Sequence, residues 1–371
     1  MQRLTLYGLS STFVILKRLD CINIQWSPRM LEPGTFELQL RAQDWDRNIA
    51  YVWTPDRKRD ENCGIVEKFR FQNTVKGRYL LISGCMATQM LNWITTYDPG
   101  VTPPKVTYDN TGAANTLCKS VIERYTSFLR LPYTRPKINA YSIPTWTGVP
   151  PTDTITLKSN GGKLGDMLYA GLKTINAGQY LQLNPESGEF YHTLRASADY
   201  SDKIIFGVNA KTALEMDASI DASQTCNNLI VGYGNDGALL SSATSGSMLL
   251  QYFPPTWAIP RDYYMTSDIE QNSGESLDDY RIRVIQDAQK AAYDGNSTEF
   301  DVSITVDQTK YEYLTDYWMG IIAGVEATEV TPKLAMLISG VDEVWKENHQ
   351  TISVILSDVY NNGTIPTPKG L

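Results

Sequence analysis

The sequence predicts a β-rich α+β protein, with strands near both ends of the chain and a region of helices and strands between them. Two observations support this fold class. Near both ends, hydrophobic residues recur at every second position, as they do in half-buried antiparallel strands. Between these regions they recur at helical spacing in two segments. A chain of 371 residues, 42% of them hydrophobic, is long enough for two or three domains with a sizeable core.

The first domain is expected over residues 1–105, as strands joined by turns. Its clearest strand, residues 34–42, places apolar side chains on one side and polar side chains on the other. Residues 64–71 and 78–84 repeat the pattern, with turn residues between them. Such an apolar face needs a second layer or a closed barrel to cover it. Shorter elements are expected as strands at residues 14–16 and 21–26 and as a helix at residues 89–93.

The middle domain is expected over residues 106–205, as a small α+β unit. Apolar residues at helical spacing predict one helix over residues 114–129 and a second over residues 163–177. The second helix is followed by two apolar runs within residues 180–194, and the turn between them is Asn-Pro-Glu-Ser-Gly. This arrangement predicts a β-hairpin.

The last domain is expected over residues 206–371, where strand patterns return. An insertion at about residues 236–299 interrupts it, and we expect the insertion to pack with the middle domain. Within the insertion, Ser276 is placed to cap a helix. The strands of this domain are expected at residues 213–220, 228–231, 300–306, 336–338 and 351–356.

Charge and hydropathy argue against several partners. The net charge of −8 and a pI of about 5.0 disfavour a general attraction to nucleic acid or anionic lipid, so we expect no specific nucleic-acid binding. The basic run Arg57-Lys58-Arg59 lies between Asp56 and Asp60, and it is interpreted as a solvated loop. No segment approaches the roughly 18 consecutive apolar residues of a membrane span, so no membrane anchor is expected. The apolar N-terminal segment is interpreted as strands, not as a signal peptide.

No catalytic, cofactor or metal site is expected. The five cysteines have no C-x-x-C spacing and are interpreted as buried free thiols of a reducing compartment: Cys21, Cys63, Cys85, Cys118 and Cys226. Gly232-Tyr-Gly-Asn-Asp-Gly237 fits a dinucleotide fingerprint, but a poor helix former follows it, so a loop or hairpin is expected. His192 and His349, the two histidines, lack the spacing of a metal site.

A carbohydrate-binding or glycan-hydrolysing β-protein of a phage tail or cell surface is the competing interpretation. Glycoside hydrolysis needs two carboxylates across a cleft, and the acidic pairs are Asp44/Asp46, Asp217/Asp221 and Asp278/Asp279. Trp146 and Trp257 could serve as aromatic platforms for sugars, although aromatic residues more often pack in cores or protein interfaces. An adhesin domain is a third interpretation. It would bind intact cells as an isolated monomer.

The order of segments resembles the tail-tip baseplate hub (tail-associated, Tal-type) proteins of long-tailed bacteriophages. Residues 33–38, Pro-Gly-Thr-Phe-Glu-Leu, are similar to the family's G-[ST]-F-E-L strand. Gly-Ile-Val-Glu-Lys at residues 64–68 and Leu-Ile-Ser-Gly at residues 81–84 resemble its next conserved pair. The helix over residues 163–177 resembles the middle domain, and residues 311–356 resemble the final strands. The segment 236–296 has no counterpart in the family, and the loop over residues 101–152 departs from the family by being unusually rich in Pro and Thr.

The resemblance implies two tube-type antiparallel β-barrels with an inserted smaller α+β region. It also implies a structural baseplate hub, not an enzyme. As a homotrimer the hub would adapt the sixfold tail tube to a threefold tip, assembled in the host bacterial cytoplasm and located in the virion at the tail tip. Partners would be the distal tail or tail tube protein, the tape-measure protein and, in some members, receptor-binding or fibre proteins. Side chains such as Phe69 and Phe71 would fill the barrel. Subunit-interface residues are not identified, and no appended enzyme module is expected after Leu371.

Overall fold

The structure is a computed structural model that forms two compact units. It describes residues 3–58, 60–75, 77–96, 107–126, 137–140, 151–221, 228–233, 238–241, 262–266, single positions within 272–284, and residues 299–327, 331–346 and 349–359. The first unit contains Met1–Asp217 with Ser303–Ser357, and the second contains Ala218–Val302 with Asp358–Leu371. Each unit is described by itself.

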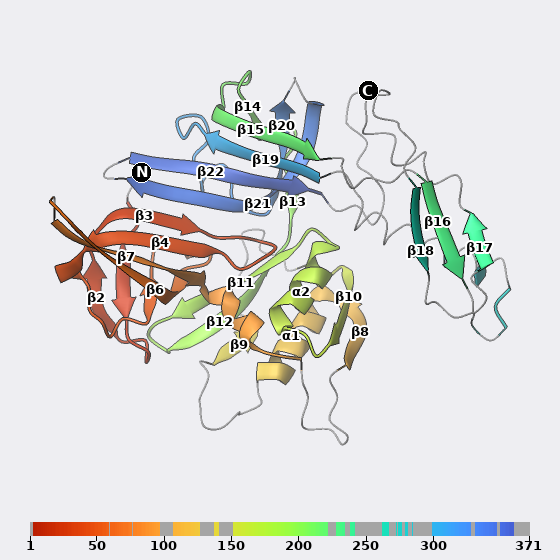
Figure 1. Cartoon of the computed structure of the whole chain (residues 1–371), viewed down its shortest axis with the longest axis horizontal. Helices are drawn as coiled ribbons and strands as arrows, with labels where there is room; N and C mark the ends of the chain where they lie inside the picture. Colours follow the sequence, from red (N-terminus) through yellow and green to blue (C-terminus); the bar gives the residue numbers. More distant parts are fainter. Residues whose placement is uncertain are drawn as a thin grey trace. The chain divides into compact units, whose positions relative to one another are not determined.

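The first unit is built on a 14-stranded sheet. Its strands are β1 (Leu6–Leu9), β2 (Ile15–Leu19), β3 (Cys21–Ser27), β4 (Thr35–Arg41), β5 (Tyr51–Trp53), β6 (Cys63–Thr74), β7 (Gly77–Met86), β13 (Ala198–Asp199), β14 (Ile205–Gly207), β15 (Ala213–Asp221), β19 (Glu299–Val306), β20 (Ile321–Ala327), β21 (Thr331–Lys346) and β22 (His349–Asp358). The order is β15-β19-β22-β21-β3-β4-β7-β6-β5-β1-β2, and β20 pairs with β21, β13 and β14 off this path (Figure 1). Strands from both ends of the chain therefore share one sheet.

The long strand β21 joins the two ends of the chain. Its first half pairs with β20, and its second half pairs antiparallel with β3, from Glu343 opposite Trp26 to Lys346 opposite Asn23. Because β21 is 16 residues long, it reaches both partners. The described strands therefore form one open path instead of the two separate closed barrels that were expected. The β-rich α+β fold class is confirmed.

Two helices and two small sheets complete the first unit. The helices are α1 (Ala114–Thr126) and α2 (Leu164–Lys173), with the 3-10 helices η1 (Ala42–Asp44) and η2 (Ala87–Trp93). β8 (Thr107–Ala113) pairs antiparallel with β10 (Thr154–Asn160). The expected hairpin is β11 (Gly178–Asn184) with β12 (Glu189–Arg195), and β9 (Ile138–Ala140) lies parallel to β12.

Both expected helices are present, with different ends. The second helix ends at Lys173, earlier than expected, because Asn176 takes a left-handed conformation with φ of 51° and the Ala177 amide bonds back to Leu172. The C-terminal part expected for the first helix, at Phe128 and Leu129, lies outside the described residues.

The hydrophobic core continues from the first strands into the helical region. One cluster of buried residues includes Leu9 and Ile65 from the main sheet, Leu117 from α1, Leu168 from α2 and Phe190 from β12. A second cluster lies between the strands of the main sheet and includes Trp26, Leu38, Leu40 and Trp345. The proposed boundary at residue 105 thus crosses a continuous core, and the three-domain division stays a prediction.

The second unit contains a separate three-stranded sheet. β16 (Asn228–Tyr233) pairs antiparallel with β17 (Ala238–Ser241) and parallel with β18 (Asp262–Thr266). The helix cap expected at Ser276 is present, because its hydroxyl accepts a 3.1 Å hydrogen bond from the Asp279 amide. Among the described residues, no helix is long and apolar enough to span a membrane.

At Gly84, strands β6 and β7 approach each other too closely to leave room for a side chain. A Cβ atom at this position would lie 1.8 Å from the Ile65 carbonyl oxygen, which the sheet holds in place. We expect Gly84→Ala to lower the free energy of unfolding by about 2–3 kcal/mol, measured by urea denaturation. Gly112→Ala is the control, because its nearest contact would be an ordinary 4.0 Å to Leu117. Equal effects of the two substitutions would contradict the steric account.

Candidate functional site: a buried charged cluster and an open sheet

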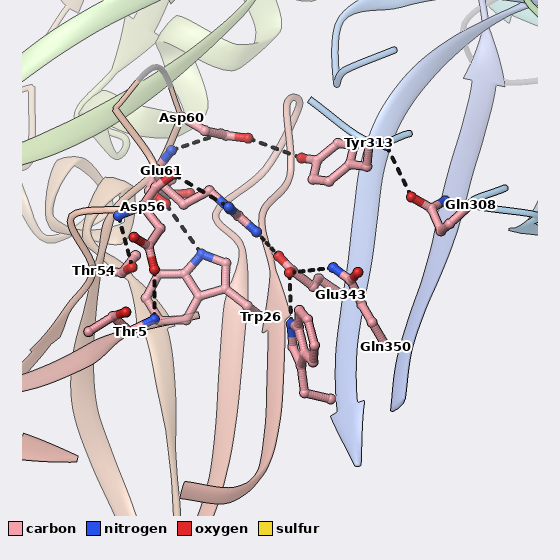
Figure 2. A network of polar contacts seen from close by, with 12 residues as sticks. Thr5, Trp26, Thr54, Asp56, Asp60, Glu61, Gln308, Tyr313, Glu343 and Gln350 are labelled. Atoms are coloured by element: carbon pink, nitrogen blue, oxygen red, sulfur yellow. Dashed lines mark hydrogen bonds and ion pairs between the residues drawn. The ribbon is translucent and has the colours of Figure 1, made fainter. Parts of the chain in front are cut away.

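A cluster of buried charged residues surrounds the loop between β5 and β6. Its members, named here the junction cluster, are Arg57, Asp60, Glu61, Arg195, Tyr313 and Glu343. Each is no more than 8% exposed, although buried charges are rare in proteins unless they are paired. Figure 2 shows Asp60 and Glu61 on the loop, facing Tyr313 and Glu343 from the far end of the chain. The cluster therefore joins segments from opposite ends of the sequence.

Arg57 forms an ion pair with Glu343 on β21. The Glu343 carboxylate also accepts hydrogen bonds from Trp345 Nε1 at 2.8 Å and from Gln350 Nε2 at 2.9 Å. Burial would lower the pKa of Arg57, but the adjacent Glu343 carboxylate outweighs this effect and raises it. Arg57 is therefore charged, which corrects the interpretation of this run as a solvated loop. Lys58 is exposed, and Arg59 lies outside the described residues.

Asp60 connects the loop to β12 and to Tyr313. Its Oδ1 lies 2.9 Å from Arg195 Nη2, and its Oδ2 accepts a 3.2 Å hydrogen bond from the Tyr313 hydroxyl. Arg195 also donates to the Met319 carbonyl, and its guanidinium lies 4.8 Å from the centre of the Tyr180 ring. This set of contacts satisfies a charge pair that is almost completely removed from water.

Glu61 differs from the other carboxylates because no cation pairs with it. Its Oε1 accepts hydrogen bonds from the amide and hydroxyl of Thr88, and its Oε2 has no partner. Burial raises the pKa of Glu61 to about 8. At neutral pH the carboxyl group is therefore mainly protonated, and the two arginines balance the two remaining carboxylates.

The contacts of the junction cluster fasten chain segments together. Gln182 donates to the Arg57 and Asp60 carbonyls, and Asn62 exchanges two hydrogen bonds with the Leu183 backbone. These contacts hold the loop against β11. A hydrolytic carboxylate pair needs access to solvent, and Asp60 and Glu61 are each 1% exposed. The arrangement supports structural rigidity.

The histidines lie apart from one another. His192 on β12 is buried, its Nε2 lies 2.9 Å from Gln179 Oε1, and burial lowers its pKa to about 3. It is a neutral core residue. His349 begins β22 and is exposed. In the described part of the chain, no three His, Cys, Asp or Glu side chains gather as a metal site would require.

The acidic pairs lie in turns, edges and caps. Asp46 accepts hydrogen bonds from the amide and side chain of Asn48, as in a polar turn, and Asp44 ends η1. Asp217 is exposed on β15, and Asp279 starts the helix that Ser276 caps. Nothing is described for the side chain of Asp221 or for Asp278, Trp146 and Trp257. A described pocket of about 330 Å³ has one carboxylate, Asp20, among its lining residues.

The structure places Gly232 of the glycine-rich motif in a strand and four of the cysteines in the protein interior. Gly232 lies in β16, and the next described segment is the strand β17 instead of the helix that a dinucleotide site requires. Gly234 to Gly237 lie outside the described residues. Four of the cysteines are free and buried: Cys21, Cys63, Cys85 and Cys118. Cys226 is not among the described residues.

One face of the main sheet is polar across several strands. Asn23 and Gln25 on β3 lie opposite Gln39 and Glu37 on β4, and β4 lies beside β7 with Glu37 opposite Ser83. On the strands from the end of the chain, the hydroxyls of Thr305 and Ser353 lie 3.2 Å apart. The alternate positions of these strands are buried. The sheet therefore separates an apolar core from a face rich in Asn, Gln, Ser and Thr.

Phe69 and Phe71 on β6 do not fill the core as expected. They lie opposite Ile82 and Leu80 on β7, so they share the apolar face of the sheet. However, they are 54% and 58% exposed, because β5 ends its pairing with β6 at Ile65 and leaves them uncovered. The aromatic neighbour of Phe69 is Trp45, with ring centres 5.6 Å apart.

Comparison with known proteins identifies the family. A family model described as Siphovirus ReqiPepy6 Gp37-like protein matches residues 12–356. The chain belongs to this Gp37-like family. No curated protein sequence matches it significantly.

Solved tail proteins share the fold of this Gp37-like protein. The tail protein from Neisseria meningitidis MC58 has 12% identity and a TM-score of 0.53, with 98% of this chain and 100% of that chain covered. The 43 kDa tail protein of prophage MuSo2 from Shewanella oneidensis has 12% identity and a TM-score of 0.55, covering 97% and 99%. Prophage tail protein gp18 from Listeria monocytogenes EGD-e has 10% identity and a TM-score of 0.52, covering 96% and 94%. The resemblance to phage tail proteins is confirmed.

Glu61 should make the Gp37-like protein less stable as pH rises. The pKa of Glu61 is about 8 in the folded chain and near 4.5 when unfolded, so the folded state holds the extra proton between these values. Its contribution to stability therefore falls with pH across this window, by at most about 1.4 kcal/mol per pH unit. Glu61→Gln keeps the acceptor for Thr88 and removes the titration.

In urea unfolding from pH 5 to pH 9, we expect Glu61→Gln to match the wild type near pH 5 and to be more stable by several kcal/mol above pH 8. Parallel pH profiles of the two proteins would show that Glu61 is not the titrating group.

Arg57 and its neighbour Lys58 give a matched pair of substitutions. Arg57→Met leaves Glu343 buried without its ion pair, so the free energy of unfolding should fall by about 3–5 kcal/mol. Lys58→Met changes an exposed side chain, so it should alter stability by less than about 0.5 kcal/mol. Urea denaturation at pH 7 measures both. If both substitutions changed stability only slightly, residues 57–59 would be better described as a solvated loop.

Proposed function

We propose that this Gp37-like protein is the structural hub at the tip of a phage tail. Three copies would form a ring around a channel and adapt the sixfold tail tube to a threefold tip. The observation that carries this proposal is the joining of two strand groups, β3-β4-β7-β6 and β21-β22-β19-β15, through the β21–β3 pair. One group comes from the N-terminal part of the chain and the other from its C-terminal part, so a ring of three chains would present six such groups to the tube. The two barrels expected from the sequence would then correspond to these two strand groups of one sheet.

The polar face of the sheet suits a channel through which DNA passes. Tight binding of DNA requires many Lys and Arg contacts to phosphates. The described positions of this face include many amides and hydroxyls, and its charged members include both signs, such as Glu37, Arg41 and Lys68. Such a surface would let a polyanion slide without being held.

The hub proposal assigns partners by position. The distal tail or tail tube protein would lie on one side of the ring, the tape-measure protein would end at its channel, and receptor-binding or fibre proteins would attach at the tip. These assignments follow from the family resemblance and from the shared fold of prophage tail proteins. The protein would act mechanically, without catalysis, and would be located in the virion tail.

The mass in solution tests the proposal first. Multi-angle light scattering should give about 125 kDa, three times the chain mass of 41.6 kDa, and electron microscopy should show threefold rings with a central channel. A monomer at concentrations near 100 µM would contradict self-assembly. A monomer that also bound glycans on an array would favour the carbohydrate-binding alternative.

A further inference from the structure

Among the described residues of the first unit, the strand edges that lack a neighbour include part of β6 and the outer edge of β15. β5 pairs with β6 along Cys63–Ile65 alone, and a bulge at Glu67 follows, so residues 68–74 of β6 pair with β7 on one side. At the other end of the sheet, β15 pairs with β19 and ends the path. Free strand edges favour pairing with another chain.

The free part of β6 has two different faces. Phe69 and Phe71 extend the apolar face of the sheet while remaining more than half exposed. Lys68 and Arg70 alternate with them, so they lie on the polar face, where both are exposed. This edge therefore offers aromatic rings on one side and positive charge on the other.

The first half of β15 has the complementary pattern. Leu214, which is 64% exposed, shares one face with Met216. Glu215 and Asp217 alternate with them and are exposed. This edge therefore offers aliphatic side chains on one side and negative charge on the other.

We propose that residues 213–217 of one copy pair as a strand with residues 68–74 of β6 in the next copy. The inference rests on the trimer proposed above and names its contact. Pairing would place Leu214 and Met216 beside the two phenylalanines, and the two carboxylates beside the two cations. Because the two surfaces differ, the contact is head-to-tail, and repeating it closes a ring instead of joining copies into symmetric pairs.

The outer edge of β2 is the competing surface. It is the last strand at the opposite end of the path, and it carries Lys17 and Arg18. Its exposed apolar residues are consecutive, at Val14, Ile15 and Leu16, so they do not lie on one face. β2 cannot match both faces of β15 at once, whereas β6 can.

Charge exchange between the two edges tests the contact in the full-length chain. Lys68→Glu/Arg70→Glu should place like charges together and weaken each contact by about tenfold or more, so the mass from light scattering falls toward that of a monomer at low micromolar concentration. Glu215→Lys/Asp217→Lys should do the same. A chain carrying all four substitutions restores opposite charges and should recover the mass of the wild type. Far-UV circular dichroism and thermal unfolding check that each variant folds.

Lys17→Glu/Arg18→Glu on β2 is the matched control and should leave the assembly intact. If the wild type is a trimer and both reversed variants remain trimers, the proposed pairing is wrong while the hub proposal stands. If the β2 variant dissociates and the β6 variant does not, the contact belongs to β2. A wild type that stays monomeric contradicts both the pairing and the trimer. The pairing is supported if both double variants dissociate and the variant with all four substitutions is again a trimer. A folding defect would not be corrected by adding two more substitutions.

Discussion

Two buried ion pairs, Arg57 with Glu343 and Asp60 with Arg195, hold together segments that are far apart in the sequence. The loop that carries Arg57 and Asp60 is too short to build a core of its own, and the strands around it come from three parts of the chain. Since an unpaired charge in this setting would be very costly, each partner must be in place for the others to remain buried. The cluster thereby fixes how β12, β21 and the segment around Tyr313 meet, and the orientation of the sheet edges depends on that arrangement.

The elements predicted best are those whose signal is local. The hairpin over residues 180–194 and the helix cap at Ser276 depend on neighbouring residues, so the sequence was sufficient to find them. The burial of Arg57 could not be found in this way, because its partner lies 286 positions away. The pattern placed Phe69 and Phe71 on the correct face, yet their exposure depends on where β5 ends. Alternation reports the face of a strand, but it does not report what covers that face.

The same limit explains the open sheet. A period of two indicates a strand with one buried face, and two groups of such strands suggest two barrels. Whether each group closes on itself or joins the other depends on strand pairing at long range. Here β21 is long enough to pair beyond its own group, and no local signal in Thr331–Lys346 marks that second partner. For a tail component, a continuous sheet has the advantage that loads pass between the modules through backbone hydrogen bonds instead of a flexible linker.

The pairing of β3 with β21 also constrains when the protein can fold. About 300 residues separate the two strands, and ribosomes add roughly 5–20 residues per second. The edge of β3 that pairs with β21 therefore stays unpaired for roughly 15–60 seconds after its synthesis. During that time Trp26 is not yet packed with Trp345 in the core. Such a chain is exposed to wrong strand pairing during its synthesis.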